Sequence, residues 1–320
     1  MPRIFNSFLF KLVLTVTVSI FIGFQIAKID LEHIGIFGTE LQSAEKSFRG
    51  IFGTEAQSEN IYDTRLQSQI EAFLTDAEGE YAIYVQDLKP ESKRNICVRC
   101  QESFEAASLY KVFLMAAVFQ AVNDGKLAMD TQIGAKLSHL DTVLGGRDFG
   151  YEDFDVSETI GYTVREALVR VAVFSDNYAA LLLAEKVGWD KIQEMANSAG
   201  ATSTSLQNPI STSARDIGLV MEKLYRGEIV SLESSEQILD LLSKAQNNNR
   251  IPAKLPESLK VAHKTGELAG VRNDGGVVFL EGNPYVIVLM SKNLEGEDDG
   301  VENLAQISKI VYDYYAANPQ

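Results

Sequence analysis

The stretch AASLYKVFLMAAVF, residues 106 to 119, places a serine and a lysine at the start of a long apolar segment. Ser108 and Lys111 are three positions apart, so on a helix they would share one face. A serine hydroxyl becomes a good nucleophile only when a neighbouring base takes its proton, and a buried lysine can be neutral enough to act as that base. A serine that caps a buried helix would explain the same letters, so the pair alone decides little.

Two further stretches change this balance. SDN occurs at residues 175–177, just before a helical run, and HKTG occurs at residues 263–266, on a predicted strand. The set S-x-x-K, S-D-N and K-T-G, in this order, is typical of class A β-lactamases and penicillin-binding proteins. Residues 61–320 therefore resemble this superfamily of active-site serine enzymes, and the resemblance extends through FEAASLYKV, YTVREALVRVAVFSDNYAA and HKTGELAGVRNDGGVV.

The resemblance implies an α/β (α+β) fold, with a five-stranded antiparallel sheet flanked by helices, a mainly helical subdomain, and the site between them. Sequence periodicity agrees with this fold. We predict strands at YAIYVQDL, KRNICVR, LKVAHKTG, GGVVFLEG and PYVIVLMSK, and helices at IYDTRLQSQIEAFLTDAEG, over most of residues 112–250, and at ENLAQISKIVYDYYAA. Strands near both ends with helices between them predict a sheet assembled from the two ends of the chain.

The resemblance also implies roles for the residues of the first two motifs. Ser108 would attack the carbonyl of an amide and become acylated, and Lys111 would accept its proton. Ser175 would pass a proton toward the leaving nitrogen. Asn177 would bind the side-chain amide of the substrate and steady Lys111.

The third motif is expected to bind the other end of the substrate. Lys264 and Thr265 would hold a substrate carboxylate, since an ammonium and a hydroxyl suit an anion. Gly266 would leave room for the acyl group, and the backbone N–H groups of Ser108 and Glu267 would form the oxyanion hole. A carboxylate at Glu267 would partly neutralise this site, so we expect its side chain to point away from the cleft or to pair with a basic residue such as Arg272. No metal or other cofactor is expected.

The sequence departs from class A β-lactamases at one important place. These enzymes carry E-x-x-L-N between the second and third motifs, and its glutamate activates the water that releases the acyl group. Residues 201–225, ATSTSLQNPISTSARDIGLVMEKLY, contain no such motif. Asp216 follows Ser213 by three and is predicted to belong to a helix cap rather than to be a displaced base. His263 is predicted to be a structural strand residue, because nothing in the sequence indicates an acid that would orient it.

Three functions are therefore open. The first, which we favour, is a β-lactamase-related serine hydrolase with slow deacylation. The second is a D,D-peptidase that acts on peptidoglycan stem peptides, and the third is a β-lactam or cell-wall sensor that is acylated without turnover. Only seven residues precede the apolar span described next, too few for an effector domain, so a sensor would require a partner protein. The expected partner is a small-molecule β-lactam or peptide, and the protein is expected to be a monomer.

The amino-terminal region predicts export. Phe8 to Ala27 is an apolar span with one charge, Lys11, and basic residues precede it while acids dominate after it. We favour an uncleaved single-pass anchor over residues 1–28 to a cleaved signal peptide, with the catalytic domain on the extracytoplasmic side. Residues 29–60 repeat GIFGTE at 35–40 and 50–55, which we interpret as a spacer rather than a docking segment. The formal charge of −15 argues against nucleic acid as a partner.

The only two cysteines are Cys97 and Cys100, in ICVRC. A zinc site or a thioredoxin-like motif would need surroundings that the sequence does not offer. Because export favours oxidation, we predict a short disulfide at a hairpin or turn, with two free thiols as the alternative.

Overall fold

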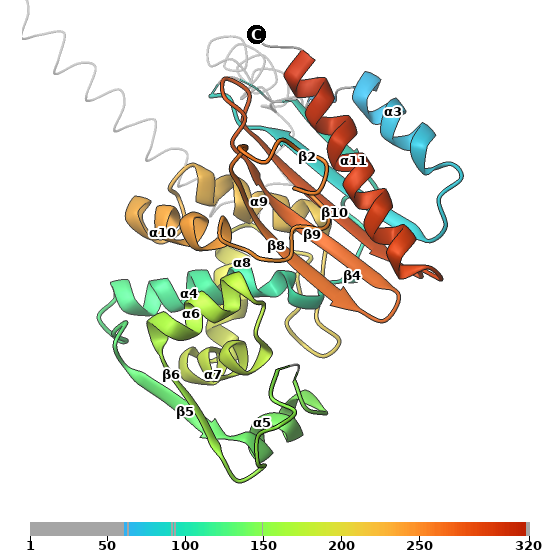
Figure 1. Ribbon diagram of the computed structural model, residues 1–320. Coiled ribbons are helices and arrows are strands. Elements are labelled where there is room, and N and C mark those ends of the chain that lie inside the picture. Colours follow the sequence, from blue (N-terminus) through green and yellow to red (C-terminus); the bar gives the residue numbers. More distant parts are fainter. Residues whose placement is uncertain (1–60, 63, 91, 93, 149, 318–320) are drawn as a thin grey trace, which may run out of the picture. The chain divides into compact units, whose positions relative to one another are not determined.

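The computed structural model describes residues 61–62, 64–90, 92, 94–148 and 150–317 (Figure 1). The predicted anchor, residues 1–28, and the predicted linker, residues 29–60, lie outside this part of the chain. Within the described residues, no helix has both the length and the apolar character needed to cross a membrane.

The centre of the fold is an antiparallel sheet built from both ends of the sequence. Its strands are β2 (Glu80–Asp87), β3 (Arg94–Val98), β8 (Val261–Leu268), β9 (Val271–Val278) and β10 (Tyr285–Lys292), in the order β3-β2-β10-β9-β8. This confirms the predicted five-stranded antiparallel sheet. A two-residue strand, β1 (Ile61–Tyr62), pairs in parallel with β3 where the sequence suggested the start of a helix, and that helix, α3, instead spans Thr64–Leu74.

Both faces of this sheet are covered by helices, which explains why the central strand β10 is apolar along most of its length. On β10, Ile287 and Leu289 belong to the core formed with α3 and α11 (Glu297–Ala317). Val286, Val288 and Met290 alternate with them and belong to the core formed with α9 (Ala214–Tyr225). Alternation follows from the two-residue period of a strand. Figure 1 shows α3 and α11 on one side of the sheet and α9 on the other.

The helical part of the fold surrounds α4 (Lys111–Asn123), which is buried along its first nine residues. Around it are α6 (Val164–Val173), α7 (Asn177–Val187), α8 (Trp189–Ser198) and α10 (Leu232–Leu242), and α5 (Leu137–Leu144) packs on α7. Two short ladders were not predicted: β5 (Gln132–Lys136) with β6 (Thr159–Thr163), and β4 (Phe104–Glu105) with β7 (Ser211–Thr212). A helix that is buried all round carries no polar face, which accounts for the uniformly apolar letters after Lys111.

The two cysteines form the predicted disulfide. Cys97 lies in β3 and Cys100 in the turn that follows, with their Cα atoms 5.0 Å apart. The bond therefore closes the end of the β2–β3 hairpin, four residues before β4 begins.

Candidate active site

Ser108 lies in a single 3₁₀ turn, η1 (Ala107–Tyr110), that packs against β8. A Cβ placed on Gly266 would come within 3.1 Å of both the Ala106 oxygen and the Ser108 nitrogen. Gly266 is therefore needed for the close approach of this turn to the strand, in addition to the room for the acyl group that was predicted. From β9, Asn273 Nδ2 donates to the Glu105 oxygen at 2.9 Å and fixes the same turn.

Lys111 is fully buried at the start of α4 and is held by the second motif. Its Nζ donates to Asn177 Oδ1 and to the Ser175 oxygen, each at 2.6 Å. The predicted contact between Asn177 and Lys111 is thus present. Burial lowers the pKa of Lys111 to about 8, although the negative charges of Asp148 and Asp176 oppose this shift. A lysine with a pKa this low has a neutral fraction near neutral pH, as a proton acceptor requires.

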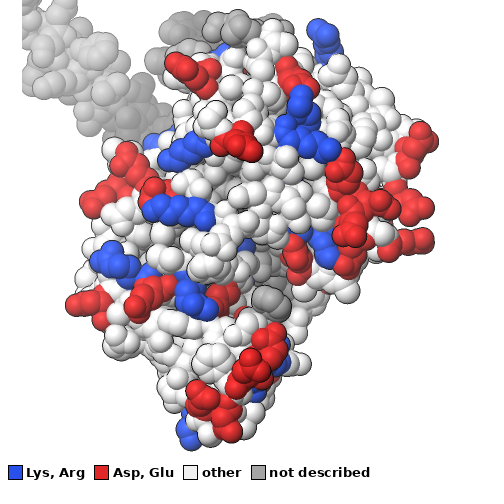
Figure 2. Space-filling view, in the orientation of Figure 1, with Lys and Arg blue, Asp and Glu red and all other residues white. Residues whose placement is uncertain are grey.

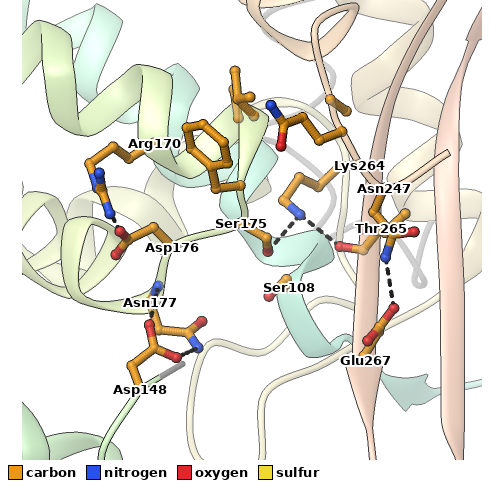
Figure 3. A pocket seen from close by; sticks show the side chains of 15 residues that line it. Ser108, Asp148, Arg170, Ser175, Asp176, Asn177, Asn247, Lys264, Thr265 and Glu267 are labelled. Atoms are coloured by element: carbon orange, nitrogen blue, oxygen red, sulfur yellow. Dashed lines mark hydrogen bonds and ion pairs between the residues drawn. The ribbon is translucent and has the colours of Figure 1, made fainter. Parts of the chain in front are cut away.

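Ser175 connects the second and third motifs. Its Oγ accepts a hydrogen bond from Lys264 Nζ at 2.7 Å (Figure 3) and a longer one from Lys111 Nζ at 3.4 Å. Because both lysines donate to this oxygen, its own proton is left to be donated into the cleft. Ser175 has a φ of 57° and Ala107, next to Ser108, a φ of 46°. Left-handed backbone at two residues other than glycine is uncommon and is concentrated at functional sites.

Lys264 and Thr265 lie on β8 beside these residues. Lys264 is almost fully buried, and its Nζ also donates to the Thr265 oxygen at 2.8 Å. Burial, followed by the nearby charge of Lys111, lowers the pKa of Lys264 well below its usual value. An anion bound next to Lys264 would favour its charged form, which agrees with the predicted carboxylate site.

Glu267 pairs with a basic residue, as one form of the expectation had it, but that residue is Arg250 and not the suggested Arg272. Its side chain lines the cleft, and its carboxylate accepts hydrogen bonds from Asn247 at 2.9 Å (Figure 3) and from Arg250. Arg272 pairs with Glu297 instead. The physical reason is that Arg250 is fully buried and needs a counter-charge. Burial opposes ionisation of Glu267, but Arg250 outweighs it, so the pKa of this carboxyl is lowered.

Asp216 has the structural role that was predicted. Its backbone N–H donates to Ser213 Oγ at 3.1 Å, which caps α9. Its buried carboxylate accepts from the Ser203 nitrogen at 2.8 Å and from Thr204 Oγ1 at 2.9 Å. Asp216 therefore fixes the segment before α9 and is not among the residues that line the cleft.

His263 is structural, but for a different reason from the one given by the sequence. An acid does orient it, since Nδ1 contacts both carboxylate oxygens of Asp274 at 2.9 and 3.0 Å. Its other nitrogen, Nε2, lies 3.0 Å from Asn248 Oδ1, and the ring is buried away from the cleft. The sequence missed this partner because Asp274 lies on β9, opposite Thr265 in the strand register.

The motif residues converge on one cleft with two connected parts. One part, of about 610 Å³, extends from Ser108 along Lys264 and Thr265 to Phe174 and Asn247. The other, of about 520 Å³, extends from Ser108 past Asp148 to Leu144, Pro209 and Leu268. Across the described residues, no group of three or more histidine, cysteine or acidic side chains could hold a metal ion.

Asp148 also lines this cleft, although it belongs to none of the three motifs. Asp148, in the loop between α5 and β6, accepts hydrogen bonds from the backbone nitrogen of Asn177 at 3.0 Å and from its Nδ2 at 2.7 Å (Figure 3). Sequence reasoning missed it because the loop has no motif and its distance from S-D-N along the chain gives no signal.

Comparison with known proteins yields a consistent family. A family model described as the β-lactamase enzyme family matches residues 65–315. The carbapenem-hydrolyzing β-lactamase KPC of Klebsiella oxytoca is 27% identical over 244 residues, which cover 70% of this chain and 79% of that protein. A β-lactamase of Streptomyces fradiae is 26% identical over 230 residues, covering 66% of this chain and 73% of that protein.

Solved structures show the same fold. PBP-A is 25% identical with a TM-score of 0.72, covering 80% of this chain and 98% of that one. A variant of PBP-A, solved as an acyl-enzyme complex with penicillin G, matches equally well in TM-score, 0.72 at 25% identity, covering 81% of this chain and 99% of that one. A β-lactamase of Sphaerobacter thermophilus DSM 20745 is 24% identical with a TM-score of 0.71, covering 79% of this chain and 98% of that one.

Proposed function

Because the chain belongs to the β-lactamase enzyme family, we propose that it is a serine hydrolase that forms an acyl-enzyme at Ser108 with β-lactams or related amides. The observation that carries the proposal is the hydrogen-bonded set of Lys111, Ser175, Asn177 and Lys264 around one cleft that Ser108 lines.

The contacts support a sequence of proton transfers for acylation. Lys111 in its neutral form takes the proton of Ser108, directly or through water, as Ser108 Oγ bonds to the amide carbonyl carbon. The carbon–nitrogen bond then breaks, and Ser175 gives its proton to the leaving nitrogen. The two lysines that donate to Ser175 can replace that proton, since both already contact its oxygen. Lys264 and Thr265 would hold the substrate carboxylate at the other end of the cleft.

Release of the acyl group is the step that separates the candidate functions. The segment before α9 contributes Asn208, Pro209 and Ile210 to the cleft, and none of these is a base. We therefore propose slow deacylation with β-lactams. Likeness to PBP-A supports a D,D-peptidase as the second candidate, and a sensor that is acylated without turnover remains the third.

One experiment separates these functions. The described domain is mixed with benzylpenicillin, a chromogenic cephalosporin or a peptide ending in D-Ala-D-Ala, and both the adduct mass and product release are followed. A persistent adduct on Ser108, absent from Ser108→Ala, supports acylation with slow release. Rapid turnover of the cephalosporin would indicate an efficient β-lactamase, and preferential cleavage of the peptide would indicate a peptidase. No adduct and no product with any of the three would contradict the proposal.

We further propose that residues 1–28 anchor the protein in a membrane with the catalytic domain outside the cytoplasm. The uninterrupted apolar span from Phe8 to Ala27 supports this. The full-length protein should then resist extraction from membranes by carbonate. A mature amino terminus near residue 28 or later would show that the segment is a cleaved signal peptide instead.

A further inference from the structure

Asp148 is fixed in place by contacts from both its side chain and its backbone. Its carboxylate receives the two hydrogen bonds from Asn177, and its own backbone N–H donates to Tyr178 Oη at 2.9 Å. The Tyr178 side chain is fully buried in α7 and donates in turn to Asp141. The carboxylate therefore occupies a defined position at the beginning of α7, next to the residue expected to bind the substrate amide.

These contacts determine which way the Asn177 amide points. A carboxylate only accepts hydrogen bonds, so Nδ2 must face Asp148. Lys111 Nζ donates to Oδ1, so Oδ1 faces Lys111, and the contacts of Nδ2 and Oδ1 are short, at 2.7 and 2.6 Å. One hydrogen of Nδ2 is used by Asp148, and the second remains for the carbonyl oxygen of a substrate side-chain amide. A flipped amide would lose both contacts.

The charge of Asp148 is not neutralised by an ion pair among the described residues. The nearest basic residue in its loop, Arg147, donates instead to Asp141 and to the backbone oxygens of Tyr151 and Phe154. Glu105 is exposed and lines the same part of the cleft. The loop continues through exposed acids at 152, 153, 155 and 158, and Figure 2 shows acidic side chains gathered at this end of the helical part.

The other end of the cleft holds Lys264, the buried cation expected to bind the substrate carboxylate. Arg250 lies close enough to lower the pKa of Lys264, but its charge is paired with Glu267. A substrate whose carboxylate is held by Lys264 and Thr265 therefore extends its acyl side chain past Ser108 toward Asn177 and Asp148, whose carboxylate forms no ion pair among the described residues and acts on Lys111 without direct contact. A carboxylate has about four acceptor positions, and Asn177 occupies two of them.

We propose that Asp148 is a positioning and specificity-determining residue, which orients Asn177 and makes this end of the cleft selective for acyl side chains with a positive charge near the amide. The favoured class is an aminoacyl or peptidyl group with a free ammonium. The inference rests on the proposed function, because it takes the acyl side chain to lie beside Asn177.

Three penicillins test the selectivity on the unmodified protein. Benzylpenicillin, ampicillin and carbenicillin share one nucleus and differ at the carbon next to the side-chain carbonyl, which carries hydrogen, an ammonium or a carboxylate. The second-order rate constant for adduct formation on Ser108 is measured by mass spectrometry at a pH of about 6.5, where most of the amine is protonated. Ampicillin should react about tenfold or more faster than carbenicillin at low salt, with benzylpenicillin between them, and the spread should shrink at about 1 M salt.

The substitution Asp148→Asn should bring the ratio of ampicillin to carbenicillin close to one. Since the ratio is taken within one variant, any general loss of acylation cancels. Asp313→Asn is the matched control, because it makes the same charge change on α11, where Asp313 pairs with Lys309. The control should keep the ratio of the unmodified protein.

The positioning role has a separate readout, the pH profile of benzylpenicillin acylation. The groups that act on Lys111 are Asp148, Asp176, Lys264 and the two acceptors Ser175 and Asn177. Removing the negative charge of Asp148 should shift the acidic limb of the profile to lower pH, whereas a loss of folded protein would only reduce its height.

The outcomes are distinguishable. Equal rates for the three penicillins in the unmodified protein, or an unchanged ratio in Asp148→Asn, would overturn the selectivity while acylation at Ser108 stands. If Asp148→Asn does not fold, the order of the three rates and its salt dependence in the unmodified protein decide. Absence of any adduct on Ser108 would overturn the proposed function and this inference with it.

Discussion

Two sides of the cleft differ in the side chains that they contribute. The second motif and β8 contribute Ser175, Asn177 and Lys264, each joined to another motif residue by a hydrogen bond. The segment before α9 contributes Asn208, Pro209 and Ile210, an amide and two apolar side chains. The acid nearest to that segment in sequence, Asp216, accepts hydrogen bonds from Ser203 and Thr204 and so has a structural role. Under the proposed function, acylation and release of the acyl group would therefore depend on separate parts of the fold, and only the part that serves acylation carries a candidate base.

The strongest test of the side that serves acylation is Lys111→Met, which keeps the volume and removes the candidate base. Acylation by benzylpenicillin should fall by about 10³-fold, within the range that general bases contribute. The measurement is the rate of adduct formation, with Lys309→Met on α11 as the control, since Lys309 does not line the cleft and its ion pair is with Asp313. If acylation of Lys111→Met stays within about tenfold of the unmodified protein, another group takes the serine proton.

The side formed by the segment before α9 can be tested by adding a carboxylate that could act as a base. Asn208→Glu places a carboxylate in the part of the cleft that Ser108 also lines. If the missing base limits release, the lifetime of the penicillin adduct should shorten by about 10²-fold. Asn208→Gln, with the same length and no charge, should leave the lifetime unchanged. An equal lifetime in both variants would mean that water or geometry, rather than a base, limits release.

The pH dependence of acylation tests whether Lys111 acts as the base. The proposed base is the neutral form of Lys111, whose pKa is lowered to about 8. The acylation rate should therefore rise about tenfold per pH unit below that value and level off above it. A stopped-flow measurement of adduct formation between about pH 5 and 10 would reveal this limb, and a rate independent of pH over the whole range would contradict a lysine base.

The smallest predicted effect concerns Glu267. This carboxylate lines the cleft, but we expect its ion pair with Arg250 to make it unavailable as a base. Glu267→Gln should lower the free energy of unfolding by about 1–2 kcal/mol at neutral pH, since the pair is half exposed on the glutamate side. The pKa of Glu267 is lowered in the folded protein, so the stability is present above the ordinary value of 4.5 and is lost as the pH falls through the lowered pKa.

Urea denaturation of Glu267→Gln, with Glu233→Gln on α10 as an exposed control, would measure this difference. If the adduct lifetime lengthens in Glu267→Gln while stability is unchanged, Glu267 acts as a base for release and the comparison of the two sides fails.

The sequence predicted the local features that have strong local signals. The strands, the helix after Ser108, the cap at Ser213 and the disulfide could be recognised from period, spacing and composition. The three motifs brought the expected residues to one cleft, and the contact of Lys111 with Asn177 was expected from them.

Contacts between distant segments could not be predicted in this way. No sequence motif marks Arg250, Asp148 or Asp274. Their partners depend on which strands and loops lie side by side in the folded protein. For this reason a basic partner for Glu267 could be expected while its identity could not, since Arg272 is its neighbour in strand register whereas Arg250 lies outside the sheet. Charge pairing follows burial, and burial is known only from the packed structure.

The position of β10 in the middle of the sheet has a consequence for how the chain folds. β10 pairs with β2 on one side and β9 on the other, so strands from the two ends of the sequence become neighbours only when the last strand is available. Pairing strands that are far apart in the sequence requires closure of a long loop, which slows folding. We expect that a chain ending before Tyr285 would leave β2 and β9 with free edges, a template for aggregation. During synthesis or transport, the carboxyl-terminal strand would therefore determine when the cleft first comes into existence.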